Sequence, residues 1–280
     1  MIKGILFDLD GVFYVGEEAI EGAARSLEWI RQQDIPHLFL TNTTSRPRSA
    51  IVEKLSGMGI DIDPATILTP PVAASRWIAE HVDGPLALFI PEATRSEFSA
   101  FEQLGEEAAE GAGAVVFGDM GQEWTFGRLN RAFRLLMQKP VPPLVALGMT
   151  RYWRSEEGLQ LDTGPFVKAL EYATGKEAVV MGKPATAFFD AAMTMLGCEP
   201  SECLMVGDDI RGDIAGSQAL GIKAALVRTG KFSESDLETG IVPDLLLDSI
   251  CDLPAWRTWT AYGRGVLVTT SRPLWQQPAG

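Results

Sequence analysis

The chain has 280 residues and a formal net charge of −13 at pH 7, with 24 lysines and arginines against 37 aspartates and glutamates. This length is enough for about two domains of roughly 150 residues each, and the acidic balance argues against a nucleic-acid groove, which must collect basic side chains. The three cysteines fit neither a disulfide framework nor a zinc site, and no apolar run approaches the roughly 18 residues of a membrane span. We therefore expect a cytoplasmic protein without nucleic-acid or membrane partners.

Short apolar runs alternate with helical periodicity along the chain, which predicts an α/β fold with a mainly parallel, Rossmann-like sheet. A buried strand is expected over 2–7 and a helix over 19–32, whose apolar residues recur at 3-4-3 spacing. A second strand over 37–40 precedes a helix over 47–58. Further candidates are a helix over 125–137 and strands over 86–90, 114–117, 144–147, 178–181, 204–206 and 224–227.

Two carboxylates follow the first expected strand. Asp8 and Asp10 stand at positions i and i+2 and so point to one side of the pleat. They also lie at the carboxyl end of the strand, where open α/β sheets bind ligands. A polar turn is the simple alternative. A calcium-binding loop is excluded, because the positions that would need an oxygen ligand and a glutamate hold Val12 and Ala19.

Three later strand ends also carry polar side chains. They are Thr41 with Asn42, then Lys183, then the acidic stretch 206–213. Each of these alone has a simple structural explanation, such as a helix cap, a surface lysine or a turn. Four strand ends that carry Asp/Asp, Thr/Asn, Lys and Asp/Asp in this order indicate a shared site.

In the order and spacing of these motifs the sequence resembles the haloacid dehalogenase-like hydrolases, which are mostly magnesium-dependent phosphatases with a Rossmann-like core. The resemblance covers roughly residues 3–252. It implies that Asp8 is the nucleophile and Asp10 the general acid/base. The catalytic residues that it implies are Asp8, Asp10, Thr41 and Lys183, and the substrate-binding residues are these four with Leu9 and Asn42.

The resemblance also implies a Mg²⁺ cofactor, held by the carboxylates of Asp8 and Asp208 and by the backbone carbonyl of Asp10. Asp209 and Asp213 are expected to orient the surrounding shell. The chemistry of these residue types agrees, because an aspartate can attack phosphorus to form an aspartyl-phosphate and a second one can act as acid and base. A divalent cation and the Lys183 ammonium would offset the charge of the phosphate, and hard oxygen ligands favour Mg²⁺.

The spacing of the motifs predicts the domain organisation. Residues 11–40, between Asp10 and Thr41, leave no room for a domain, whereas 42–182, between Thr41 and Lys183, far exceed one or two βα units. We expect a hydrolase core over 1–74 and 179–260, an inserted α/β cap over 75–178 and a C-terminal tail over 261–280.

This arrangement is similar to the subfamily of p-nitrophenylphosphatase-like and phospholysine phosphohistidine inorganic pyrophosphate phosphatase-like enzymes, with the stretches 150–153, 164–166 and 169–173 closest to the latter. The resemblance implies hydrolysis of phosphate monoesters of small phosphorylated substrates through an aspartyl-phosphate, and a homodimer formed through the cap.

Phosphoamide or pyrophosphate hydrolysis stays open as an alternative. A haloalkanoate dehalogenase would need neither Mg²⁺ nor Asp10, and a phosphomutase of this superfamily usually carries its cap between the first two motifs. A catalytically silent binding protein would not need the intact set Asp8, Asp10, Lys183 and Asp208.

Overall fold

The computed structural model describes residues 2–155, 158–258 and 267–268. Its strands are β1 (Gly4–Asp8), β2 (Tyr14–Val15), β3 (Glu18–Ala19), β4 (His37–Leu40), β5 (Ile67–Leu68), β6 (Leu86–Phe89), β7 (Ala114–Phe117), β8 (Leu144–Ala146), β9 (Tyr152–Ser155), β10 (Gly158–Leu161), β11 (Val179–Val180), β12 (Cys203–Gly207), β13 (Lys223–Val227), β14 (Leu245–Leu247) and β15 (Leu267–Val268). The α-helices are α1 (Ala23–Gln32), α2 (Arg48–Gly57), α3 (Pro70–His81), α4 (Phe126–Leu136), α5 (Thr163–Thr174), α6 (Thr186–Leu196) and α7 (Gly216–Gln218). Shorter 3-10 segments are η1 (Pro64–Thr66), η2 (Glu92–Phe98), η3 (Gly121–Glu123), η4 (Pro200–Glu202), η6 (Glu234–Glu238) and η7 (Ile250–Thr258), and η5 (Ile210–Ala215) is a π-helical turn.

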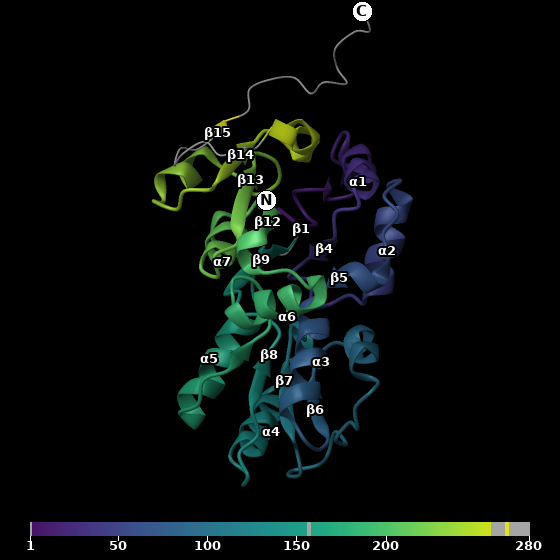
Figure 1. Cartoon of the computed structure of the whole chain (residues 1–280). Helices are drawn as coiled ribbons and strands as arrows, with labels where there is room; N and C mark the ends of the chain where they lie inside the picture. The colour runs from purple at the N-terminus through teal and green to yellow at the C-terminus, as the bar shows by residue number, and fades with distance from the viewer. Residues whose placement is uncertain (1, 156–157, 259–266, 269–280) are drawn as a thin grey trace, which may run out of the picture. The chain divides into compact units, whose positions relative to one another are not determined.

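The chain divides into two compact units, each built on a parallel sheet. The first unit comprises 2–41, 52–68 and the described residues from Ala192 on, and the second comprises Asn42–Ile51 and Thr69–Ala191. In the first unit seven strands pair in the order β15-β14-β13-β12-β1-β4-β5, with β1 between β12 and β4 (Figure 1). The predicted α/β class with a mainly parallel sheet is confirmed.

The central strand β1 is buried along its whole length, as expected for a parallel sheet that is covered on both faces. Phe7 on this strand, Phe13 in the following loop and Phe39 on β4 pack together, and the ring centroid of Phe13 lies 5.4 Å from each of the other two. Edge-to-face aromatic pairs of this kind add to the stabilisation that burial gives. The loop that carries Asp10 is therefore anchored by aromatic packing.

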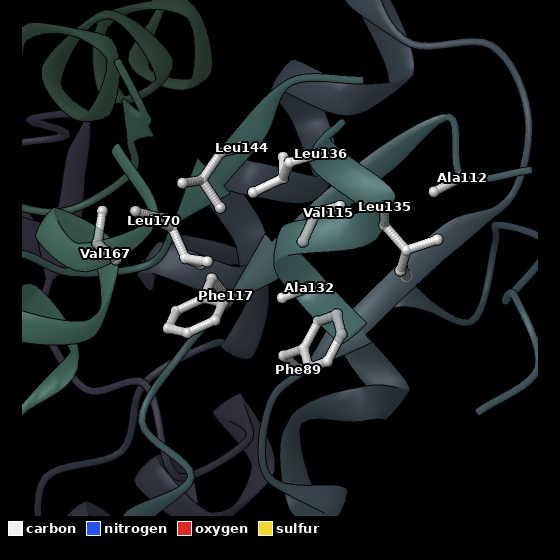
Figure 2. Close-up of a cluster of buried hydrophobic side chains, with 12 residues drawn as sticks. Phe89, Ala112, Val115, Phe117, Ala132, Leu135, Leu136, Leu144, Val167 and Leu170 are labelled. Carbon is white, nitrogen blue, oxygen red and sulfur yellow. The ribbon is translucent and has the colours of Figure 1, made fainter. Parts of the chain in front are cut away.

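The second unit has a four-stranded parallel sheet in the order β11-β8-β7-β6. Its core is a cluster of buried side chains from these strands and from α4 and α5, including Phe89, Phe117, Leu135 and Leu170 (Figure 2). The indole ring of Trp124 stacks on Phe117 with ring centroids 4.3 Å apart. The unit therefore has a hydrophobic core of its own, which is what an inserted domain needs to be stable.

A two-stranded antiparallel hairpin, β9–β10, follows β8 in the second unit. Cross-strand partners lie on one face of a hairpin, and the partners Leu161 and Tyr152 are 59% and 56% exposed. Leu159 lies on the same face, two residues from Leu161, and is 63% exposed. The hairpin thus presents an apolar face to solvent.

The C-terminal tail and membrane-spanning segments are two further points on which the sequence makes predictions. Most of the tail expected over 261–280 lies outside the described residues, and the part that is described, β15, pairs with β14 in parallel. Among the helices of the described chain, none combines the length and the apolar character that a bilayer crossing requires.

Candidate functional site

The candidate site lies at the carboxyl edge of the seven-stranded sheet, where the strand order reverses. From β1 the chain continues to β4 and β5 on one side, and it later returns to β12, β13 and β14 on the other side. Asp8 ends β1 and Asp208 directly follows β12, and Phe7 is in register with Val206. Ligands of open α/β sheets bind at such a switch point.

Three carboxylates converge at this edge. Asp8, Asp208 and Asp213 each offer an oxygen within 4.8 Å of the other two, and their exposed fractions are 6%, 1% and 0%. They form the one group of three or more potential metal ligands found in the described part of the chain. Because buried carboxylates repel one another and lose hydration, a cation that prefers hard oxygen ligands fits this donor set, and Mg²⁺ has that preference.

Asp213 reaches the cluster through the π-helical turn η5. The N–H of Ile214 donates to the carbonyl of Asp209 over 3.2 Å, the i to i−5 bond that widens the turn. Gly207 at the end of β12 makes room for the Asp213 carboxylate, because a Cβ at this position would overlap it. The backbone N–H of Asp209 donates to Asp213 Oδ2 over 3.2 Å.

The Asp209 carboxylate bonds to the main chain of η5 and does not belong to the buried cluster that contains its neighbour Asp208. Its Oδ1 accepts the backbone N–H groups of Arg211 over 3.0 Å and of Gly212 over 2.8 Å, so it caps η5. The Nζ of Lys231 lies 3.5 Å from Asp209 Oδ2. Asp213 rather than Asp209 thus joins the buried cluster, and the sequence signal for this choice is Gly207, whose missing side chain makes the space.

Asp10 lies in a tight loop directly after β1. The N–H of Gly11 donates to the Tyr14 carbonyl over 2.7 Å and the N–H of Phe13 donates to the Leu9 carbonyl over 2.9 Å. Leu9 is buried, whereas Asp10 is exposed. The loop therefore separates a buried carboxylate, Asp8, from an exposed one, Asp10.

Thr41 is the first residue after β4, the other neighbour of β1. The preceding residue, Leu40, pairs in register with Asp8 on β1, and this pairing places Thr41 just beyond the end of the shared ladder. The N–H of Thr41 donates to the Leu68 carbonyl over 3.2 Å, and the side chain is 4% exposed. Thr41 thus stands at the same sheet edge as Asp8 and Asp208.

Asn42 and Lys183 are joined within the second unit, although 141 residues separate them. The N–H of Lys183 donates to Asn42 Oδ1 over 2.8 Å, and Asn42 Nδ2 donates to the Lys183 carbonyl over 3.0 Å. A Cβ on Gly182 would lie 3.1 Å from the Leu147 carbonyl oxygen, so the chain passes closely here. The amide of Asn42 therefore holds the main chain of Lys183 at two points.

Comparison with known proteins matches both ends of the motif series. Residues 5–102 match the family described as haloacid dehalogenase-like hydrolase, and residues 180–253 match the family described as HAD-hydrolase-like.

Two human proteins are similar over most of the chain. Phospholysine phosphohistidine inorganic pyrophosphate phosphatase is 36% identical over 239 residues, which cover 84% of this chain and 86% of that protein. Haloacid dehalogenase-like hydrolase domain-containing protein 2 is 36% identical over 237 residues, which cover 85% of this chain and 88% of that protein. Among solved structures, the p-nitrophenyl phosphatase from Archaeoglobus fulgidus matches with a TM-score of 0.80 and 26% identity, covering 90% of this chain and 98% of that one.

Proposed function

Because the chain belongs to the haloacid dehalogenase-like hydrolase family, we propose that it is a Mg²⁺-dependent phosphatase that hydrolyses phosphate monoesters through an aspartyl-phosphate. The observation that carries this proposal is the convergence of Asp8, Asp208 and Asp213 at the switch point of the parallel sheet. A nucleophilic carboxylate at that edge, with acidic neighbours, is the arrangement that phosphoryl transfer to a protein side chain needs.

In the first step a carboxylate oxygen of Asp8 forms a bond to phosphorus, and the bond from phosphorus to the ester oxygen breaks. Asp10 gives its proton to the departing oxygen, so the alcohol leaves neutral. In the second step Asp10 takes a proton from water, and the water oxygen attacks the phosphorus. The bond from Asp8 to phosphorus breaks, which releases inorganic phosphate, restores the carboxylate of Asp8 and leaves Asp10 protonated for the next turnover. The exposure of Asp10 supports this role.

Thr41 and Lys183 bind the phosphate in this proposal. The Thr41 hydroxyl donates a hydrogen bond to a phosphate oxygen, and the backbone N–H groups of Leu9 and Asp10 do the same. Lys183 supplies an ammonium whose charge offsets that of the phosphate. Asn42 contributes by holding the main chain of Lys183, since both ends of its side-chain amide bond to it.

The Mg²⁺ site in this proposal consists of the carboxylates of Asp8 and Asp208 and the backbone carbonyl of Asp10, with Asp213 beside them. When bound, the ion would offset the negative charge that the buried carboxylates and the phosphate bring together. The supporting observation is the chemistry of the buried donor set, which consists of carboxylate oxygens without histidine or cysteine.

Substrate choice is assigned to the insert, proposed as a cap over 75–178 between core segments 1–74 and 179–260. Phosphoamides and pyrophosphate form a second substrate class, which the similarity to phospholysine phosphohistidine inorganic pyrophosphate phosphatase favours. The homodimer also remains a proposal, supported by the exposed apolar face of the β9–β10 hairpin. A cytoplasmic location is supported by three cysteines that form no disulfide.

A phosphate-release assay tests the proposed function. Purified protein is offered p-nitrophenyl phosphate, phospholysine, phosphohistidine and pyrophosphate, each with Mg²⁺ and with EDTA, and Asp8→Asn serves as the matched control. We expect release that requires both Mg²⁺ and Asp8, and the ranking of substrates decides between the two classes. Release that persists in EDTA or in Asp8→Asn would overturn the mechanism.

A further inference from the structure

A turn outside the four motifs, residues 229–231, contacts two of the loops that form the candidate site. It follows β13, which pairs with β12, which in turn pairs with β1. The hydroxyl of Thr229 donates to the carbonyl of Gly11, 218 residues away in the sequence. The turn after β13 therefore extends past β12 and contacts the loop after β1.

The same turn holds the carboxylate of Asp208. The backbone N–H of Lys231 donates to Asp208 Oδ2 over 2.7 Å, a short bond of the kind that a charged acceptor forms. Fixing one carboxylate oxygen restricts rotation about the Cβ–Cγ bond of Asp208. The orientation of a central acid of the site is thus set by main chain from another loop.

Two glycines allow this close approach. Gly230 has φ +65° and Gly11 has φ +87°, in the left-handed region that favours glycine. A Cβ at either position would overlap Asp208 Oδ2. The two loops and the carboxylate are therefore packed without room for a side chain between them.

The turn is itself anchored on its far side. The N–H of Arg228 donates to the Leu247 carbonyl over 2.9 Å, and its guanidinium forms an ion pair with Glu234 at 2.8 Å. Ser233 and Asp236 close a reciprocal capping box at the start of η6. The 229–231 turn, which bonds to Asp208, is therefore fixed by the sheet before it and by a capped helical turn after it.

We propose that Thr229 is a positioning residue for the metal site: by bonding to Gly11 it keeps the 229–231 turn against the loop after β1, and so keeps Asp208 in the orientation that binds Mg²⁺. This inference rests on the proposed function, since it presupposes a Mg²⁺ site at Asp208. It assigns to Thr229 no contact with the substrate or the ion.

The test compares Thr229→Val, which keeps the shape but loses the hydroxyl, with Thr229→Ser, which retains it. Thr66→Val is the matched control, because Thr66 is likewise half-buried in the first unit and its hydroxyl donates to the Asp63 carbonyl over 2.6 Å. Mg²⁺ affinity is measured without substrate by isothermal titration calorimetry, and melting in EDTA checks that each variant folds. The Mg²⁺ concentration for half-maximal phosphate release is measured in parallel.

We expect Thr229→Val to weaken Mg²⁺ binding by about 10–100-fold, the usual loss when a group that orients a metal ligand is removed. Thr229→Ser should bind within about threefold of the wild type, as should Thr66→Val. Wild-type affinity in Thr229→Val, or equal losses in the valine and serine variants, would overturn the inference. If those results came from a wild-type protein that binds Mg²⁺ and releases phosphate, the proposed function would stand; a wild type that does neither would overturn both.

Discussion

The two units of the chain hold their charged groups by different means. In the first unit Asp208 is fixed by a main-chain N–H and by glycines packed against its carboxylate. In the second unit the side-chain amide of Asn42 fixes the main chain of Lys183, from which a flexible four-carbon stem carries the ammonium. In the first unit, main-chain atoms fix the orientation of a side-chain carboxylate. In the second unit, a side chain fixes the main chain from which a lysine extends.

The largest expected effect tests whether chemistry belongs to the first unit. Asp8→Asn keeps the size of the side chain but removes the attacking charge, so turnover should fall by about 10⁴-fold or more. Asp10→Asn should lower it by about 10²–10⁴-fold. Steady-state kinetics with p-nitrophenyl phosphate measures both variants, and circular dichroism serves as the folding control. Turnover near the wild-type value in Asp8→Asn would remove the nucleophile from this unit.

A core substitution tests whether the second unit is stabilised independently. Leu135 on α4 is fully buried in the cluster of Figure 2, so Leu135→Ala should lower the free energy of unfolding by about 2–5 kcal/mol. Urea denaturation measures the loss. Mg²⁺ affinity of the folded protein should stay at the wild-type value, and a matching loss of affinity would contradict the separation of the two units.

A pair of aspartates sharpens the account of the acidic site. Asp213 lies in the buried cluster whereas Asp209 caps η5. Asp213→Asn should therefore weaken Mg²⁺ binding by about 10–100-fold, and Asp209→Asn by less than about threefold. Calorimetric titration with Mg²⁺ measures both, and Asp208→Asn provides the upper limit. A larger loss for Asp209→Asn would reverse the assignment within this acidic stretch.

The smallest expected effect concerns the two hydrogen bonds between the Asn42 side chain and the Lys183 main chain in the second unit. Asn42→Ala removes two hydrogen bonds from Lys183, worth about 1–2 kcal/mol together, so kcat/KM should fall by about 5–30-fold. Asn130→Ala, which changes a half-buried asparagine of the same unit on α4, is the control. An unchanged kcat/KM in Asn42→Ala would show that Lys183 needs no such anchor.

The fold could largely be predicted because its central strands are continuous apolar runs. The strands expected over 37–40 and 114–117 match β4 and β7 at both ends. The helix expected from residue 19 begins only at Ala23, because Glu18–Ala19 pairs with Tyr14–Val15 as a short hairpin. The two-residue strand β5 and the strand β14 were not predicted. A run of two or three apolar residues has no periodicity to show which element it forms.

The family and the enzyme class predicted from the four motifs are confirmed, since the similar curated proteins are phosphatases of the haloacid dehalogenase-like family. Asp8 could be chosen from sequence because it directly follows an apolar strand run, whereas the choice of Asp208 over Asp209 came from the resemblance, in which the aspartate directly after the glycine is the metal ligand. The separate positions of Asp209 and Asp213 could not be chosen in this way, because they depend on the π-helical turn η5, although Gly207 is a sequence sign of space for a carboxylate beside β12. The bonds between Asn42 and Lys183 also escaped prediction, since a side-chain amide gives no sign in sequence of a main-chain partner 141 residues away.

The pairing of β1 with β12 has a consequence for how the chain is made. Gly4 pairs with Cys203, so β1 cannot gain its neighbour on that side until the chain has been synthesised as far as β12. The strands β6, β7, β8 and β11 pair with successive neighbours in chain order, and contacts that are close in sequence form early. Proteolysis of ribosome-bound chains stalled at increasing lengths should therefore detect protection of 69–191 before protection of β1. During synthesis, Asp8 would therefore meet Asp208 and Asp213 only after the strands of the second unit have paired.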